Sequence, residues 1–245
     1  MSDIASNDGW SEADSETFID YGRYYLPERE QQIETICGLI PDTSPPSHVV
    51  ELCCGEGLLS HALLEHLPNA TVHAYDGSPK MLAHTRSRLA QFGDRFDTTR
   101  FDLAASDWRA FPWPLTGVVS SLAIHHLDGP GKQALFADVA RALAPGGIFV
   151  VADLVEPTSE ASRRVAAKAW DDAVRQRALE LDGDLAAFET FQADGWNHFS
   201  AAEPDPVDMP SPLKSQLDWM EAAGLRDIDV HYLKAGHAIF SGRKR

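Results

Sequence analysis

Short apolar runs alternate with helical apolar patterns along residues 45–155, and this alternation restricts the fold more than any other feature of the sequence. The runs are nearly continuous in apolar residues, as expected for strands of a parallel sheet that is covered on both faces. The sequence therefore predicts an α/β fold with a doubly wound, mostly parallel sheet. We expect strands at His48–Leu52, Thr71–Tyr75, Arg100–Leu103, Val118–Leu122, Ile148–Ala152, Ile228–Tyr232 and Ala238–Ser241.

Helices are expected between these runs, where apolar residues recur with a period near 3.6. The clearest case is Pro130–Leu143. It has a proline at its start and Gly146-Gly147 just past its end, which are the residues usually found at these two ends of a helix. The predicted helices are Leu58–Leu67, Pro79–Phe92, Pro130–Leu143, Ser159–Leu181 and Ser215–Ala223, preceded by a helical pattern from Phe18 to Ile40.

The balance of acidic and basic residues indicates which classes of substrate the chain can bind. The chain has 21 basic and 37 acidic residues, a net charge of −16, which argues against a nucleic-acid substrate because phosphates need compensating cations. No apolar run is long enough for a bilayer, and the acidic N-terminus is unlike a signal peptide. We therefore expect a cytoplasmic protein without a membrane partner. Three cysteines, two of them adjacent, predict neither disulfides nor a metal site.

The segment Val49–Gly57 contains the densest chemical signal. An apolar strand ends there, small residues form a sharp turn, and a helix begins, which lets a ligand approach the backbone closely. The turn lacks the third glycine of the dinucleotide fingerprint. Glu51 at the strand end would disfavour a phosphate and suit an amino group.

Two more acidic residues follow later strands. Asp76 comes about 20 residues after the glycine turn, the spacing at which a carboxylate accepts hydrogen bonds from ribose hydroxyls. A carboxylate at that position supports the binding of adenosine. It does not distinguish between cofactors that contain adenosine, because dinucleotide-binding enzymes have the same acidic residue. Asp102 follows the third predicted strand, where an isolated aspartate would be an ordinary turn residue.

Together these segments resemble the class I, Rossmann-like S-adenosylmethionine-dependent methyltransferases. The resemblance rests on Glu51–Gly57, on Asp76-Gly-Ser-Pro-Lys-Met-Leu82, on Val118–Asp128 and on Leu143–Val151, in the family's order. Cys53 departs from the family, which usually has glycine there. The resemblance implies a seven-stranded sheet of order 3-2-1-4-5-7-6 with the last strand antiparallel, and S-adenosylmethionine as cofactor. The implied cofactor-binding residues are Tyr25, Arg29, Glu51, Leu52, Cys53, Gly55, Asp76, Gly77, Met81, Asp102, Leu103, Ser121 and His126.

The family also implies how the chain is organised. In the family, the N-terminal helices and the segment after strand five cover the active site and select the substrate. The expected parts are a flexible tail (1–15), a helical cover (16–44), the cofactor-binding core (45–155), a lid insertion (156–212) and a C-terminal helix with two strands (213–245).

Candidate acceptor-binding residues come from the cover, the lid and the end of the fourth strand. They are Tyr21, His125, Trp170, Trp196 and Phe199. For each aromatic residue of the lid taken singly, packing of the lid is the favoured interpretation. His126 and His198 are candidate proton acceptors. Adjacent histidines point in different directions, and no nearby cysteine or acidic residue completes a ligand set, so no metal site is predicted.

The predicted function is methyl transfer to the O, N or C atom of a small molecule. Alternatives are a tRNA-modifying methyltransferase, an NAD-type oxidoreductase and a non-catalytic binding protein with the same fold. The missing third glycine counts against the oxidoreductase. The sequence leaves open the acceptor, the methylated atom, and whether the chain forms a homodimer.

Overall fold

The computed structural model describes residues 11–201 and 205–245. A seven-stranded sheet of order β3-β2-β1-β4-β5-β7-β6 forms its centre. β7 is antiparallel to both of its neighbours and the other pairs are parallel. This confirms the predicted fold and strand order. The strands are β1 (Ser47–Leu52), β2 (Ala70–Asp76), β3 (Phe96–Arg100), β4 (Leu115–Ser121), β5 (Leu143–Leu154), β6 (Arg226–Lys234) and β7 (His237–Arg243).

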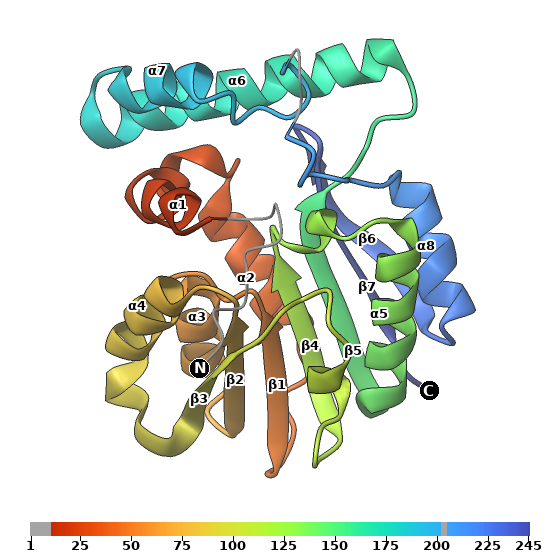
Figure 1. The fold of residues 1–245 in the computed structure, drawn as a ribbon. Coiled ribbons are helices and arrows are strands. Elements are labelled where there is room, and N and C mark those ends of the chain that lie inside the picture. The colour runs from red at the N-terminus through yellow and green to blue at the C-terminus, as the bar shows by residue number, and fades with distance from the viewer. Residues whose placement is uncertain (1–10, 202–204) are drawn as a thin grey trace, which may run out of the picture.

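Helices cover both faces of the sheet, and a further group lies above the carboxyl ends of the parallel strands (Figure 1). No helix within the described residues is long and apolar enough to cross a membrane. The α-helices are α1 (Glu12–Tyr25), α2 (Arg29–Leu39), α3 (Leu58–His66), α4 (Pro79–Leu89), α5 (Gly129–Ala142), α6 (Glu160–Asp182), α7 (Ala186–Ala193) and α8 (Leu213–Ala222).

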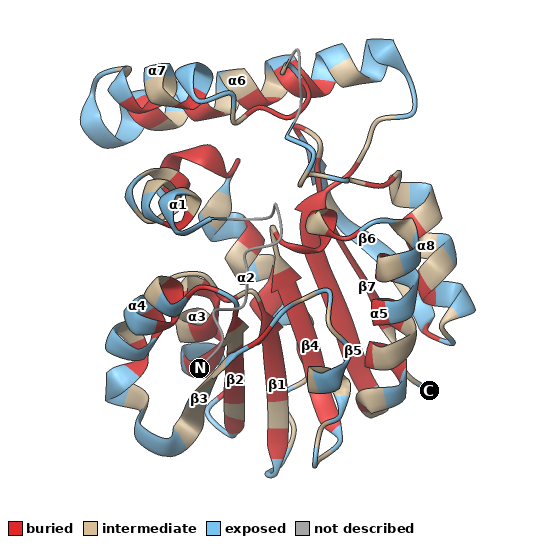
Figure 2. Cartoon of the chain, in the orientation of Figure 1, coloured by how far each residue is buried: buried red, intermediate tan, exposed pale blue. Residues whose placement is uncertain are grey.

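Alternate side chains of the central strands pack into two separate cores, because successive residues of a strand face opposite sides. On β1, Val49 packs with residues of α2 and α3, whereas Val50 packs with residues of α5 and α8. Both valines are fully buried. The near-continuous apolar runs in the sequence thus correspond to strands that are buried on both faces (Figure 2).

The third strand is not where the sequence predicts it. The prediction was Arg100–Leu103, whereas β3 is Phe96–Arg100. β3 is an edge strand with a polar sequence, Phe-Asp-Thr-Thr-Arg, and none of its residues is fully buried. An apolar run is therefore a poor guide to it, while its two threonines suit a strand through their branched side chains.

The N-terminal region also differs from prediction. Residues 1–15 were expected to be a flexible tail, but α1 already begins at Glu12. Ser11 and Asp14 form a reciprocal capping box that satisfies backbone donors at the helix start. Residues 1–10 lie outside the described part of the chain.

The cover and the lid pack together as a third core. Tyr24 and Tyr25 of α1 are buried with Trp170 and Val174 of α6 and with Phe191 of α7. The indole nitrogen of Trp170 donates to the carbonyl oxygen of Tyr25 at 2.7 Å. Segments that are far apart in the sequence therefore form one layer above the sheet (Figure 1).

Candidate functional site

A pocket opens at the carboxyl ends of β1 and β4, between the sheet and the N-terminal helices. The space in and in front of it that protein atoms do not fill is about 500 Å³, open solvent included. Five of the predicted cofactor residues line it, which makes it the leading candidate for a ligand site. These are Arg29, Glu51, Cys53, Gly55 and Ser121.

The turn after β1 has an unusual backbone at Cys53. Its φ of 56° is left-handed, a conformation that glycine adopts easily and other residues seldom adopt. Gly55 has the same φ. The backbone nitrogen of Cys54 donates to the carbonyl oxygen of Tyr75 at 2.9 Å, which ties the turn to β2. The turn therefore keeps the glycine-type shape although cysteine occupies its first small position.

Glu51 is the last but one residue of β1 and lies at the pocket wall, 2% exposed. One of its carboxylate oxygens accepts a hydrogen bond from the Ser60 hydroxyl. Burial raises the pKa of Glu51 to about 8, against the opposing effect of that hydrogen bond. A cationic ligand group would favour the charged carboxylate here. The neighbouring Leu52 is fully buried in the core.

Asp76 is the last residue of β2, and its carboxylate connects the turn after β1 with the turn after β2. Its carboxylate accepts hydrogen bonds at 2.8 Å from the backbone nitrogens of Gly55 and Ser78. Burial raises the pKa of Asp76 to about 6, although these hydrogen bonds act in the opposite direction. The carboxylate is thus fixed beside the turn, in a position suited to further hydrogen bonds. Met81, 3% exposed, lies in the first turn of α4 immediately after it.

The third acidic residue is held less tightly. Asp102 is exposed and its carboxylate accepts a hydrogen bond from the backbone nitrogen of Ala104 at 2.9 Å. Leu103 beside it is half-buried. A β-carbon on Gly77 would lie 3.3 Å from the carbonyl oxygen of Phe101, so the two loops approach closely. The loops after β2 and β3 are therefore adjacent.

Arg29 enters the pocket from the first turn of α2. It lies 4.0 Å from Glu56, and its guanidinium group has a buried terminal nitrogen without a hydrogen-bond partner among the described residues. Burial lowers the pKa of Arg29. A buried donor without an acceptor is costly, so this nitrogen suits an anionic ligand group such as a carboxylate. The hydroxyl of Tyr25 is also buried without such a partner, and Tyr21 stacks on the Tyr25 ring.

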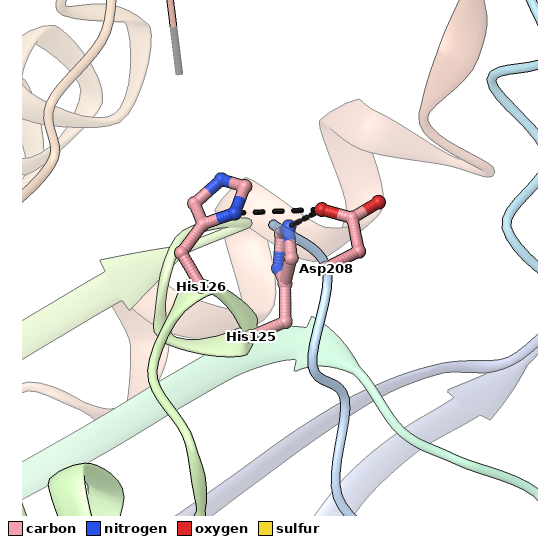
Figure 3. A group of neighbouring side chains, drawn as sticks. All are labelled: His125, His126 and Asp208. Atoms are coloured by element: carbon pink, nitrogen blue, oxygen red, sulfur yellow. Dashed lines mark ion pairs between the residues drawn. The ribbon is translucent and has the colours of Figure 1, made fainter. Parts of the chain in front are cut away.

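A cluster of ionisable side chains lies just beyond β4. His125 and His126 form part of the short helix η3 (Ile124–His126), and Asp208 comes from the loop before α8 (Figure 3). Nε2 of His125 and Nδ1 of His126 are each 3.4 Å from the same Asp208 oxygen. His198 adds an Nδ1 atom 3.9 Å from the other oxygen. Histidines of both the core and the lid thus lie around the carboxylate of Asp208.

Buried charges set the protonation of this cluster. Burial lowers the pKa of His125, but the ion pair with Asp153, 2.5 Å away, and the contact with Asp208 outweigh it and raise the pKa to about 10. Burial and the neighbouring His125 lower the pKa of His126 to about 4. Burial also lowers the pKa of His198. At neutral pH, His126 and His198 are therefore uncharged.

The aromatic residues of the lid differ in their surroundings. Trp170 and Phe199 are each 5% exposed and pack inside the third core, whereas Trp196 is only half-buried and contacts the Tyr25 ring. Contact with an acceptor stays a prediction for all three. Trp196 and Tyr21 have the more accessible side chains of the predicted set.

Two members of the cluster were missed by the sequence analysis. Asp208 lies in a loop rich in proline and aspartate, where nothing distinguishes it from Asp205. Asp153 lies near the end of β5, next to β7, and only the fold brings it to His125. The absence of a metal site was inferred from local spacing, which could not include either residue.

Comparison with known proteins agrees with this geometry. The family model for a methyltransferase domain matches residues 49–147. A trans-aconitate 2-methyltransferase of Acidovorax sp. (strain JS42) is 32% identical over 193 residues, 74% of this chain and 69% of that protein. A trans-aconitate 2-methyltransferase of Variovorax paradoxus (strain S110) is 30% identical and covers 86% of this chain and 83% of its own length.

A solved structure supports the fold. An O-methyltransferase family protein from Burkholderia thailandensis superposes with a TM-score of 0.66 at 13% identity. The match covers 96% of this chain and 60% of that one, so the present chain spans somewhat more than half of that protein.

Proposed function

The chain belongs to the class I S-adenosylmethionine-dependent methyltransferases and methylates a small molecule, and we propose that this acceptor is a small carboxylic acid methylated on oxygen. The observation that carries the cofactor assignment is the pocket at the ends of β1 and β4, whereas the acceptor is inferred from the named relatives. The pocket combines a buried acidic group, Glu51, with a mostly buried cation, Arg29.

The two charges suit the amino-acid end of S-adenosylmethionine. Glu51 would accept a hydrogen bond from the amino group, and Arg29 would pair with the carboxylate through its unpartnered nitrogen. Asp76 would accept from the ribose hydroxyls, with Met81, Asp102 and Leu103 around the adenine. The oxidoreductase alternative is weaker, because a phosphate would meet the carboxylate of Glu51 in this turn.

The acceptor is proposed to lie beyond Ser121, beneath the cover and the lid. The enclosed position favours a small molecule. Relatives named trans-aconitate 2-methyltransferase support a carboxylic acid in particular. Trp196 and Tyr21 offer apolar surface for its carbon skeleton.

The chemistry requires little beyond positioning. When bound, S-adenosylmethionine would supply an electrophilic methyl group next to a sulfonium. Transfer of this group would form a bond from the methyl carbon to a carboxylate oxygen of the acceptor and break the bond from carbon to sulfur, with the electron pair left on sulfur. A carboxylate is already ionised at neutral pH, so no proton needs to be removed. The residues of the pocket and lid align the two reactants and exclude water.

The proposed roles of His126 and His198 as proton acceptors apply only if the acceptor is a hydroxyl group. Both histidines are uncharged at neutral pH, so neither acceptor predicts a rate that changes much above about pH 6. The two cases are therefore distinguished by the chemistry of the methylated product.

The proposal can be tested with methyl-labelled S-adenosylmethionine and a panel of small di- and tricarboxylic acids that includes trans-aconitate. We expect label in a product that releases methanol on mild alkaline treatment, as a methyl ester does. Asp76→Asn should lose most of the activity, while Asp94→Asn, an exposed matched control, should retain it. Label only in alkali-stable products, or no transfer to any acid, would refute a carboxylic acid acceptor.

A further inference from the structure

We propose that His125, His126 and Asp208 bind a divalent first-row transition-metal ion, such as Zn²⁺, beside the acceptor end of the pocket. These three residues come from η3 and from the loop before α8 (Figure 3). Their ligand atoms lie within 4.8 Å of one another. Two imidazoles and one carboxylate are a donor set that suits zinc, iron, cobalt or nickel more than magnesium or calcium.

The distances from the two histidines to Asp208 are long for direct hydrogen bonds, and Nδ1 of His126 is equally far, 3.4 Å, from the carbonyl oxygen of Val207. Nε2 of His125 and Nδ1 of His126 are both 3.4 Å from Oδ1 of Asp208. Hydrogen bonds between such atoms are usually about 2.7–3.2 Å long. Ligand atoms on the edge of a tetrahedral zinc site, with bonds of about 2.0–2.1 Å, are instead roughly 3.4 Å apart.

Asp153 orients the first ligand. Its carboxylate accepts a hydrogen bond from Nδ1 of His125 at 2.5 Å and another from the His125 backbone nitrogen at 2.9 Å. Nδ1 therefore carries a proton, and Nε2 is directed at Asp208. Metal-binding histidines commonly donate their other ring nitrogen to a carboxylate in this way, which fixes the ring and the tautomer.

His198 gives an independent indication of a missing ligand. Its side chain is 6% exposed, and its Nδ1 atom is buried without a hydrogen-bond partner among the described residues. That atom is 3.9 Å from Oδ2 of Asp208, on the same side as the cluster. A buried nitrogen without a partner is costly. Coordination to the ion, directly or through a bound water, would satisfy it.

The loop that carries Asp208 is held in place by contacts to the residues that follow Asp208. The backbone nitrogen of Met209 donates to the carbonyl oxygen of His125 at 2.8 Å. Lys132 donates to the carbonyl oxygen of Met209 at 2.5 Å and to the Ser211 hydroxyl at 3.0 Å. The ligand atoms are thus prearranged by backbone contacts around them, as a specific metal site requires.

An ion would also change the charge that the acceptor meets; this step rests on the proposed function. Asp153 and Asp208 place two carboxylates near the proposed acceptor position, and the charged His125 between them offsets only one of these charges. Like charges repel strongly at such distances. A divalent ion with an open coordination position would offset them and could take an oxygen of the acceptor.

The test is a metal titration of the full-length chain without a histidine tag, in the absence of S-adenosylmethionine and of any acid. Zn²⁺ binding is measured by calorimetry, and Co²⁺ binding by its visible absorption. We expect one equivalent of either ion per chain and no competition from Mg²⁺. Because no methyl donor is present, this result is independent of the proposed function.

Variants locate the site. Asp208→Asn and His126→Gln should each weaken Co²⁺ binding by about 100-fold or more, since even the loss of an outer partner costs about 10- to 100-fold. Asp94→Asn and His84→Gln, both exposed and remote in sequence, should leave it unchanged. Circular dichroism verifies that each variant is folded.

Two results would overturn the proposal. One is the absence of stoichiometric Zn²⁺ or Co²⁺ binding by the unmodified chain, which would leave the cluster as an ion-paired contact between lid and core. The other is binding that folded Asp208→Asn and His126→Gln chains retain in full.

Discussion

At the scale of single residues, Cys53 is the clearest departure from what the turn requires. Its left-handed φ costs a residue with a β-carbon about 1–2 kcal/mol, yet the turn keeps its hydrogen bond to β2. A small side chain is tolerated at this position, whereas a branched one would raise the backbone strain.

Substitutions at Cys53 test this explanation. Cys53→Gly should stay within about 1 kcal/mol of the unmodified chain, because relief of strain is offset by the entropy of glycine and the lost side chain. Cys53→Val should lose about 2 kcal/mol or more of the free energy of unfolding. Urea denaturation measures both, and equal stability of the two variants would contradict the strain argument.

Glu51 predicts a pH dependence of stability. Its pKa is raised by burial from 4.5 to about 8, so the folded chain binds this proton more tightly than the unfolded chain. The resulting stabilisation is complete below about pH 4.5 and is lost as the pH rises to about 8.

The measurement is the melting temperature of the cofactor-free protein between pH 5 and pH 9. Glu51→Gln should remove part of the fall seen in the unmodified chain, because an amide does not titrate. Asp76, with a pKa of about 6, contributes a similar fall at lower pH in both proteins. An identical fall in both would show that Glu51 does not titrate in this range.

The sequence could predict the residues around the glycine turn because they follow strands in a regular order. Glu51 and Asp76 stand at the ends of neighbouring strands, and the fold brings them together through local connections. Asp208 has no such relation to His125, and the contact depends on how a long insertion folds back. Local spacing contains no information about that contact.

At the scale of secondary-structure elements, the same distinction holds. Strands buried on both faces, such as β1 and β4, produced apolar runs that were placed to within a few residues. β3 was misplaced because an edge strand needs few apolar side chains. α7 was not predicted, since its eight residues are too few for a clear periodic pattern.

The contact between cover and lid makes a prediction about these elements. Trp170→Phe removes the hydrogen bond from α6 to the Tyr25 carbonyl and leaves a buried acceptor unpaired. It should cost about 1–3 kcal/mol of stability and increase the amide exchange of α1. Trp219→Phe on α8 is a matched substitution outside the lid and should leave exchange in α1 unchanged. Equal exchange of α1 in both variants would show that the two segments are not coupled.

At the scale of the whole molecule, the net charge of −16 favours a small-molecule acceptor over the alternative of a tRNA substrate. We expect no saturable binding of tRNA at physiological salt, because nucleic-acid affinity requires basic residues that replace counterions. Fluorescence anisotropy with labelled tRNA measures this. Saturable micromolar binding would favour the tRNA-modifying alternative.

The whole molecule is a cofactor-binding sheet beneath a cover made of two distant segments (Figure 1). The residues at the strand ends of the sheet indicate the cofactor, whereas we propose that the cover and the loop of Asp208 select the acceptor. The first part depends on strand ends that the sequence reveals, and it can be tested without knowledge of the acceptor.

The most direct test of the central claim is calorimetric titration with S-adenosylhomocysteine, the demethylated product. We predict one equivalent bound per chain, and binding about 10- to 100-fold weaker in Asp76→Asn, which loses a charge-assisted acceptor for the ribose hydroxyls. Asp94→Asn should bind as the unmodified chain does. No saturable binding, or unchanged affinity in a folded Asp76→Asn chain, would contradict the assignment of this pocket as the S-adenosylmethionine site.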